Sequence, residues 1–158
     1  MADRPFRIGR SKTGLGLFAT EAIPKGVRIF EYTGKVVSNE ESSRMTGTPR
    51  YLCHLNKNQM LDGSPRSNIG RYANHSCAPN SEMYVYRGHV YVRSIRVIKV
   101  GEEITYDYGK EYFDALIGKE KCLCTACVKR RARKASQPAT RKADVSRTQA
   151  GKRTARRA

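Results

Sequence analysis

A short polar stretch, residues 68–80, gathers amide, imidazole, hydroxyl and thiol groups that rarely come together to build a core. Within it, Asn74 and His75 can each donate and accept hydrogen bonds, which suits them to hold a polar cofactor. Cys77 follows closely and is a soft ligand for a metal ion. A lone Asn-His pair more often marks a polar loop with a satisfied histidine, so its meaning depends on the rest of the chain.

Three further thiols, Cys122, Cys124 and Cys127, crowd into six positions. They cannot close a tetrahedral zinc site alone, because such a site takes four nitrogen or sulfur ligands, and Cys77 is the natural fourth. The odd total of five cysteines also fits a metal site in a reducing compartment better than a disulfide framework. The sequence therefore predicts zinc bound by these four thiols, with Cys53 left over as a buried thiol.

Two tyrosines, Tyr106 and Tyr108, are spaced so that both rings would face one side of an extended strand. Such an aromatic wall can line a channel for an ammonium group through cation–π attraction and hydrogen bonds from the hydroxyls. Ordinary half-buried strand tyrosines are the alternative. Tyr32, at the end of another predicted strand, and the 68–80 stretch favour the channel.

Taken together, residues 68–80, 102–109 and 122–127 resemble the motifs of SET-domain protein lysine methyltransferases. The resemblance extends over residues 6–127 and keeps the motifs in the order of the family. One departure lies between the last two cysteines, where the family commonly has four residues and this chain has only Thr125 and Ala126. The aromatic residue that often follows in the family is also missing.

The resemblance implies a role for each matching residue. Tyr108 matches the tyrosine whose hydroxyl lies at the methyl-transfer centre, and Tyr32 matches a tyrosine of the lysine channel. Tyr106 occupies the position that tunes how many methyl groups are added, and a tyrosine there is associated with stopping at mono- or dimethylation. The positions that match binding sites for S-adenosylmethionine are Gly14, Leu15, Gly16, Arg71, Asn74, His75, Tyr108 and Leu123.

Four other polar residues also deserve a structural interpretation. Asp62, Asn68 and Asn80 match positions of the family pattern, and we expect their side chains to hold loops in place rather than to react. We expect Asp107 to be a buried structural acceptor.

The implied activity is S-adenosylmethionine-dependent mono- or dimethylation of a lysine in a basic, histone or histone-like protein. An unperturbed lysine has a pKa of about 10.4, and burial in an aromatic channel beside a positive sulfonium would lower it enough to free the nucleophile. The alternative is a non-catalytic, zinc-stabilised module that binds a peptide or nucleic acid. The joint presence of Tyr32, Tyr108, Asn74 and His75 favours the enzyme, because a binding module has little need of all four.

Positive charge is concentrated at the end of the chain. Residues 128–158 carry 12 of the 31 Lys and Arg residues and one of the 14 Asp and Glu residues. This segment has almost no branched apolar residues, so we expect it to be disordered. Such a basic arm favours nucleic acid through contacts with phosphates, and a solvated tail without a specific partner is the alternative. The tail's own lysines, such as Lys129 and Lys134, are a further candidate substrate.

Many short strand-like segments and few helices predict a mainly β, β-rich α+β fold of several small sheets. The Ser-x-x-Glu pattern at residues 38–41 is a capping box that predicts a helix over 39–45, and one helical turn is predicted within 112–117. The resemblance adds a C-terminal segment threaded as a pseudoknot beneath an earlier loop. The expected parts are a SET domain (1–109), a post-SET zinc segment (110–127) and a disordered Lys/Arg-rich tail (128–158). The strands are predicted at residues 6–8, 27–32, 51–55, 59–62, 83–86, 89–92, 95–97 and 103–106.

The chain shows no signal-peptide pattern and no run of the ~20 apolar residues that a membrane span needs. We therefore expect an intracellular protein without a membrane partner, in the nucleoid or cytoplasm of a bacterium or in the nucleus of a eukaryote. Its expected partners are a protein that carries the target lysine and nucleic acid. The basic run 129–134 fits either a nuclear signal or a nucleoid-binding arm, and the oligomeric state is left open.

Overall fold

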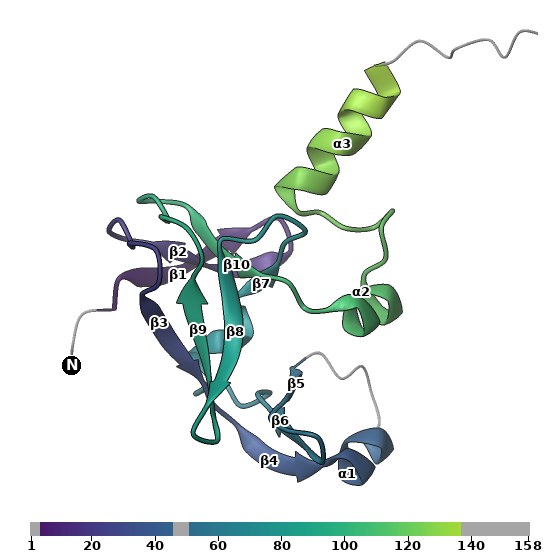
Figure 1. Cartoon of the computed structure of the whole chain (residues 1–158). Coiled ribbons are helices and arrows are strands. Elements are labelled where there is room, and N and C mark those ends of the chain that lie inside the picture. Colours follow the sequence, from purple (N-terminus) through teal and green to yellow (C-terminus); the bar gives the residue numbers. More distant parts are fainter. Residues whose placement is uncertain (1–3, 46–50, 137–158) are drawn as a thin grey trace, which may run out of the picture.

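The computed structural model describes residues 4–45 and 51–136, and within these ranges the chain forms three small sheets (Figure 1). This arrangement confirms the β-rich fold predicted from the sequence. The first sheet has the order β1 (Phe6–Ser11), β2 (Gly14–Ala19), β10 (Glu103–Tyr106) and β7 (Asn74–His75). The second has the order β3 (Arg28–Tyr32), β9 (His89–Ser94) and β8 (Ser81–Tyr86), and the third has the order β4 (Lys35–Ser38), β6 (Gln59–Asp62) and β5 (Leu52–His54).

Strand β10 brings the predicted site motifs together, because it pairs on both sides. It runs antiparallel to β2, with Ile104 opposite Leu17, and parallel to β7, with Thr105 opposite Asn74 and Tyr106 opposite His75. Residues that are about thirty positions apart in the sequence therefore become neighbours across one ladder. The segment that leaves β10 starts beside the Asn74–His75 stretch.

The helices are short, and two of them follow the predicted positions. Helix α1 (Asn39–Arg44) begins at the predicted capping box, in which Ser38 and Glu41 exchange two hydrogen bonds of 3.0 Å. A 3-10 helix, η1 (Ile69–Tyr72), precedes β7. Helix α2 (Lys110–Leu116) is longer than the single turn predicted there and starts after Gly109, whose φ of +84° suits glycine. Helix α3 (Thr125–Ser136) follows the cysteine-rich loop.

The expected start of the disordered tail at residue 128 is wrong for residues 128–136, because they form most of α3. Ala, Arg and Lys are good helix formers, and the helix starts directly after Cys124, so the domain boundary drawn at 127 falls inside a helix. Residues 137–158 of the predicted tail lie outside the described residues. Helices of the described ranges are all too short or too polar to cross a membrane.

Residues 95–97 are not the strand that was predicted there. The chain bends at residues 95 and 96, and the Arg96 guanidinium donates hydrogen bonds to the Val97 carbonyl and to the Glu102 carboxylate. Pairing resumes at an isolated bridge between Ile23 and Ile98.

The core consists of one large apolar cluster and two small ones. The large cluster lies between the first and second sheets and includes the fully buried Leu17, Val92 and Ile104. A second cluster surrounds Tyr32, and a third joins Phe113 of α2 to Cys122 and Cys127. The C-terminal segment therefore has a small core of its own, centred on cysteines.

Candidate active site

Three tyrosines from two segments of the chain line one cavity of about 850 Å³. Tyr32 ends β3, Tyr106 ends β10, and Tyr108 follows two residues later. The ring centroids of Tyr106 and Tyr108 are 5.0 Å apart, as the expected shared wall requires, although Tyr108 lies beyond the strand rather than on it. Other parts of the wall come from β5, β6, β8 and α2, including Leu52, Met60, Met83, Val85, Tyr112 and Leu116.

The hydroxyl groups of this cavity are anchored to the main chain. Tyr32 donates a hydrogen bond to the carbonyl oxygen of Tyr51, and Tyr108 donates one to that of Ala73, both at 2.8 Å. Burial, with a smaller contribution from neighbouring phenols, raises the pKa of Tyr32, Tyr106 and Tyr108 well above its ordinary value. These phenols are therefore neutral at physiological pH.

Backbone packed tightly around Tyr32 holds its ring in place. A Cβ atom added to Gly63 or Gly70 would collide with the Tyr32 ring, so these two glycines are needed for close approach. Between them, Asn68 is fully buried. Its side chain donates to the Gly63 carbonyl at 2.9 Å and accepts from the amides of Thr33 and Gly70 at 3.2 and 3.1 Å. This confirms the loop-holding role predicted for Asn68, whereas the sequence reasoning missed both glycines.

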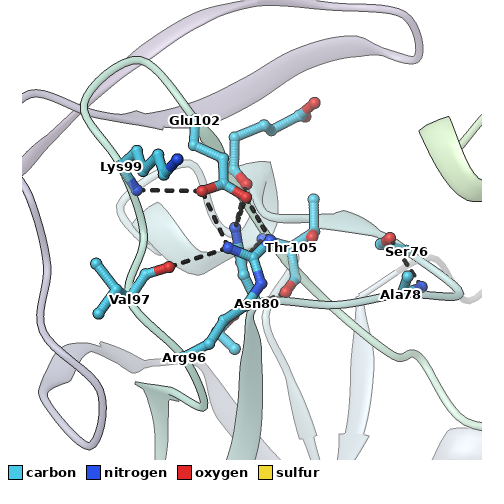
Figure 2. A network of polar contacts seen from close by, with 10 residues as sticks. Ser76, Ala78, Asn80, Arg96, Val97, Lys99, Glu102 and Thr105 are labelled. Atoms are coloured by element: carbon cyan, nitrogen blue, oxygen red, sulfur yellow. Dashed lines mark hydrogen bonds and ion pairs between the residues drawn. The ribbon is translucent and has the colours of Figure 1, made fainter.

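Asn80 also holds a loop, as predicted. Its amide donates to the carbonyl of Glu103 at 2.7 Å and accepts from the amide of Thr105 at 2.9 Å, which fixes residue 80 to β10. The same amide group lies 3.3 Å from Glu102, whose carboxylate is held by Arg96 and by the Lys99 amide (Figure 2). Chiefly because of the hydrogen bond from Arg96, the pKa of Glu102 is lowered to about 2.

Asp62 likewise acts locally, whereas Asp107 departs from the prediction. The Asp62 carboxylate accepts from the amide and hydroxyl of Ser64 within one turn. Asp107 accepts from the amide of Gly109, but its side chain is 63% exposed, so the expectation that it is buried is wrong. Because β10 ends at Tyr106, residue 107 is no longer in a strand whose side chains are covered by a neighbouring sheet.

Residues predicted to bind the cofactor meet at the edge of the first sheet. The Asn74 amide donates to the Leu15 carbonyl at 2.9 Å and to the Glu103 carboxylate at 2.7 Å. This contact brings the start of β2, residues 14–16, against Asn74. Gly14 has a φ of +114°, which favours glycine, and a Cβ atom at Gly16 would collide with the Glu103 carboxylate, so that side chain would have to shift. The sequence reasoning missed Glu103 because its partners lie on two other strands.

His75 connects this edge with the tyrosines. Its Nδ1 atom accepts a hydrogen bond of 3.2 Å from the main-chain amide of Tyr108, so the proton of the neutral ring is on Nε2. That Nε2 atom lies 3.2 Å from the Cys77 sulfur. Burial lowers the pKa of His75 despite the opposing effect of Asp107, and its ring packs against Phe113 with centroids 4.8 Å apart.

The last two predicted cofactor residues occupy different places. Leu123 is 45% exposed and lies between Cys122 and Cys124 in the sequence, so its side chain is accessible. Arg71 instead turns toward the tyrosine cavity, where its guanidinium lies over the Tyr51 ring, 4.5 Å from the centroid, and donates to the Ser64 carbonyl at 2.6 Å. Its Nε atom is buried and has no hydrogen-bond partner among the described residues.

The four predicted metal ligands gather as expected. The sulfur atoms of Cys77, Cys122, Cys124 and Cys127, here called the thiol cluster, all lie within 4.8 Å of one another, so they could hold a metal ion. The sulfur of Cys77 is 3.9 Å from that of Cys122 and 3.5 Å from that of Cys127. Tetrahedral zinc with Zn–S bonds of about 2.3 Å places its sulfurs about 3.8 Å apart, which is close to these distances.

The electrostatics of the thiol cluster also suit a cation. Burial and the neighbouring thiols raise the pKa of Cys77 and Cys122. Burial also opposes ionisation of Cys124, but hydrogen bonds from the backbone of Cys77 and Cys127 outweigh it and lower the pKa to about 6. Four thiolates this close together repel one another, and a bound divalent cation would remove that repulsion.

Comparison with known proteins agrees with this geometry. The model of the SET domain family matches residues 14–109, from β2 to the glycine before α2. Similar chains include ASHH4 from Arabidopsis thaliana, which is 34% identical over 130 residues that cover 75% of this chain and 36% of that protein. The histone-lysine N-methyltransferase ASHH3 from the same plant is 33% identical over 144 residues, covering 83% and 39% of the two chains.

A third relative is the histone-lysine N-methyltransferase Set2 from Drosophila melanogaster, which is 34% identical over 134 residues. The match covers 77% of this chain and 6% of Set2, so this chain spans well under two thirds of the length of these relatives. The family match nevertheless includes all three cavity tyrosines and the Asn74–Cys77 stretch. The chain therefore belongs to the SET domain family.

Proposed function

We propose that this chain is an S-adenosylmethionine-dependent protein lysine N-methyltransferase. The observation that carries the proposal is the meeting of Tyr32, Tyr106 and Tyr108 at one cavity, with Tyr108 hydrogen-bonded to the predicted cofactor residue His75. The names of the relatives ASHH3 and Set2, both histone-lysine N-methyltransferases, support this activity. A relative from Yarrowia lipolytica is named as specific for lysine 36 of histone H3, which supports a basic, histone or histone-like substrate.

The residues at the sheet edge fit S-adenosylmethionine, which supplies a methyl group on a positively charged sulfonium. Asn74 holds the Leu15 carbonyl at the start of β2, so backbone groups there are positioned to meet a polar ligand. Away from this edge, the exposed side chain of Leu123 can cover a purine ring. Arg71 turns toward the tyrosine cavity, and its Nε–H is a donor to which no described residue is bonded. These residues would bind and orient the ligand.

The tyrosine cavity would prepare the substrate lysine. An ammonium group cannot act as a nucleophile, and the buried, neutral phenols of Tyr32 and Tyr106 create surroundings that disfavour a charged amine. The proton leaves to water before transfer. The hydroxyl of Tyr108 donates to Ala73, so its oxygen retains lone pairs that can accept a hydrogen bond from the amine and orient it. No general base beyond solvent is needed in this scheme.

Zinc in the thiol cluster would have a structural role. A four-sulfur site is closed, without an open position for a substrate, which is typical of structural zinc. It would link the loop that carries Cys77 to the segment 122–127. Because His75 lies next to the Cys77 sulfur, this link would also hold the His75 ring in position. A histone-like substrate further implies an intracellular protein located at chromosomes, and the basic residues from 128 onward imply contact with nucleic acid.

The experiment that tests this function is methyl transfer from labelled S-adenosylmethionine to purified histones and to basic proteins of the bacterial nucleoid. Modified residues are mapped by mass spectrometry. Tyr108→Phe should lower the rate by about 100-fold, because an oriented hydroxyl at a reacting centre contributes roughly that much. Tyr86→Phe is the matched control, because Tyr86 is 48% exposed at the end of β8 and should leave the rate unchanged.

Each outcome separates the competing interpretations. Transfer to lysine that depends on Tyr108 supports the enzyme, and transfer to another residue type contradicts it. If no protein is methylated, binding of S-adenosylmethionine is measured by calorimetry. Failure to bind would favour the non-catalytic zinc-stabilised module, whereas automethylation of Lys129 or Lys134, seen by intact mass, would identify the chain as its own substrate.

A further inference from the structure

Helix α3 is an unusually basic element that projects from the sheets (Figure 1). Five of its twelve residues are Lys or Arg, and none is acidic. Within the described ranges, none of the five forms an ion pair with a carboxylate. These residues are Lys129, Arg130, Arg131, Arg133 and Lys134.

Two of the five basic residues make contacts near the start of the helix, and only Arg131 attaches it to the preceding loop. Arg130 donates to the Cys127 sulfur at 3.3 Å, and Arg131 donates to the Cys122 carbonyl at 2.7 Å and to the Lys119 carbonyl at 3.2 Å. The remaining three, Lys129, Arg133 and Lys134, are exposed and have no such contacts among the described residues. They are available to a partner.

The helix has little intrinsic reason to be stable. Its buried residue is Cys127, in the first turn, and residues 132–136 are all exposed, so no apolar face packs against the sheets. An isolated helix of this length is marginal in water. The like charges of Lys129 and Arg133, and of Arg130 and Lys134, are four residues apart and repel each other across one turn. A bound polyanion would compensate for that repulsion, because its negative charges attract all of these side chains.

The distribution of charge around α3 indicates which polyanion fits. At about 100° per residue, the three available positions, Lys129, Arg133 and Lys134, spread over an arc of about 140°. A flat acidic protein surface would meet only part of that arc, whereas the two walls of a duplex groove both carry phosphates. A helix about 10–12 Å across fits the DNA major groove, which is about 12 Å wide, and the deep, narrow major groove of RNA excludes it.

We propose that α3 binds the phosphate backbone of double-stranded DNA, and that the thiol cluster presents the helix for this purpose. Cys127 lies in the first turn of α3, and its amide donates to the sulfur of Cys124 at 3.4 Å. A metal bound by the four thiols therefore fixes the start of the helix and its direction. Binding of DNA then depends on the metal, although no thiol touches the nucleic acid.

The test uses the full chain, zinc-loaded and without S-adenosylmethionine, and a fluorescent 30-base-pair duplex of mixed sequence. Affinity is measured by anisotropy over a range of salt concentrations. The variant K129E/R133E changes two exposed residues on one face of α3 and spares Arg130 and Arg131. The matched control, K25E/K57E, makes the same change in net charge at two exposed loop lysines.

We expect K129E/R133E to weaken binding at about 0.1 M salt by on the order of 10- to 100-fold and to lower the salt slope by about 2. K25E/K57E should keep the wild-type slope. Equal losses in the two variants would overturn the proposal, because binding would then reflect total charge or residues 137–158. K129Q/R133Q, which adds no new charge, must also weaken DNA binding and lower the salt slope. Circular dichroism checks that the variants retain the helix.

Two further arms test the partner and the coupling. Affinity for poly-glutamate and for duplex RNA is measured in the same way. Tighter binding of either one than of duplex DNA, lost in K129E/R133E, would overturn the choice of partner. Removal of zinc with a chelator should reduce the helicity of the chain and should lower its DNA affinity to that of K129E/R133E. Unchanged DNA affinity would refute the coupling. These assays involve no methyl transfer, so their failure is distinct from failure of the proposed enzymatic function.

Discussion

The main-chain amide of Tyr108 donates a hydrogen bond of 3.2 Å to Nδ1 of His75. The other ring nitrogen of His75 lies 3.2 Å from the sulfur of Cys77. A single imidazole thus connects the tyrosine cavity, the predicted cofactor edge and the thiol cluster. Disturbance at the cluster should therefore reach Tyr108 through this ring, although the cluster takes no part in the chemistry.

The first prediction concerns the metal. The wild-type chain should contain about one zinc ion per chain, because four thiols make a closed tetrahedral site. Cys124→Ser should abolish this zinc, whereas Cys53→Ser should retain it, because Cys53 lies outside the cluster in the wall of the cavity. Elemental analysis of the purified proteins measures both. Equal zinc content in Cys124→Ser and the wild type would contradict the site.

Zinc removal should loosen the C-terminal segment before it unfolds the sheets. The small core of Phe113, Cys122 and Cys127 is separate from the large cluster around Leu17 and Ile104. Limited trypsin digestion after chelation should therefore cleave first at the basic residues between 119 and 134. Cleavage that begins within the sheets would show that the metal stabilises the whole domain.

The second prediction concerns the number of methyl groups added. Tyr106 is buried at the cavity, and removal of its hydroxyl, with any water bound to it, would free space for a further methyl group. Tyr106→Phe should shift the products toward trimethyllysine, whereas the wild type should stop at mono- or dimethyllysine. Mass spectrometry of a substrate peptide over time measures the distribution. The same distribution in both proteins, or trimethyllysine from the wild type, would remove this role from Tyr106.

The third prediction concerns the loop behind Tyr32. Asn68→Ala should lower the free energy of unfolding by about 3 kcal/mol, because it leaves the buried Gly63 carbonyl and the amides of Thr33 and Gly70 without partners. Asn56→Ala is the control, because Asn56 is exposed and should cost at most about 1 kcal/mol. Urea denaturation measures both, and similar costs would contradict the role of Asn68.

The fourth prediction concerns stability in acid. The folded pKa of Glu102 is lowered to about 2, chiefly by its hydrogen bond with Arg96. A lowered pKa means that the ionised carboxylate stabilises the fold above the unfolded pKa of about 4.5 and that this stability is lost as the pH falls toward 2. Because the Arg96 side chain is 49% exposed, solvent screening reduces the contribution to about 1–2 kcal/mol.

Glu102→Gln should therefore be less stable than the wild type at pH 7, and the difference should vanish near pH 2. Glu21→Gln, at an exposed position, serves as the control and should follow the wild type at every pH. Urea denaturation at pH 7, 4 and 2, all with chelator so that metal loss is common to the proteins, measures the difference. A gap that stays constant with pH would mean that the carboxylate charge is not responsible.

Local patterns were sufficient to locate most of the elements. The capping box at Ser38 and Glu41 depends on contacts within one turn, and the hairpin of β8 and β9 follows from two β-rich runs around the turn at Arg87 and Gly88. The types and spacing of the tyrosines and cysteines likewise singled out the residues that meet at the tyrosine cavity and in the thiol cluster. In these cases the prediction depends on the chemical nature of the side chains and on their spacing, both of which the sequence contains.

Only the tertiary structure decided which distant groups meet. The contact of Asn74 with Leu15 and Glu103 depends on the pairing of β10 with strands on both sides, and the need for Gly63 and Gly70 depends on where Tyr32 lies. Local composition also misled for residues 128–136. The composition has no apolar face to drive folding, but the thiol cluster anchors the first turn of α3, and that anchor exists only because the loop carrying Cys77 comes close in space.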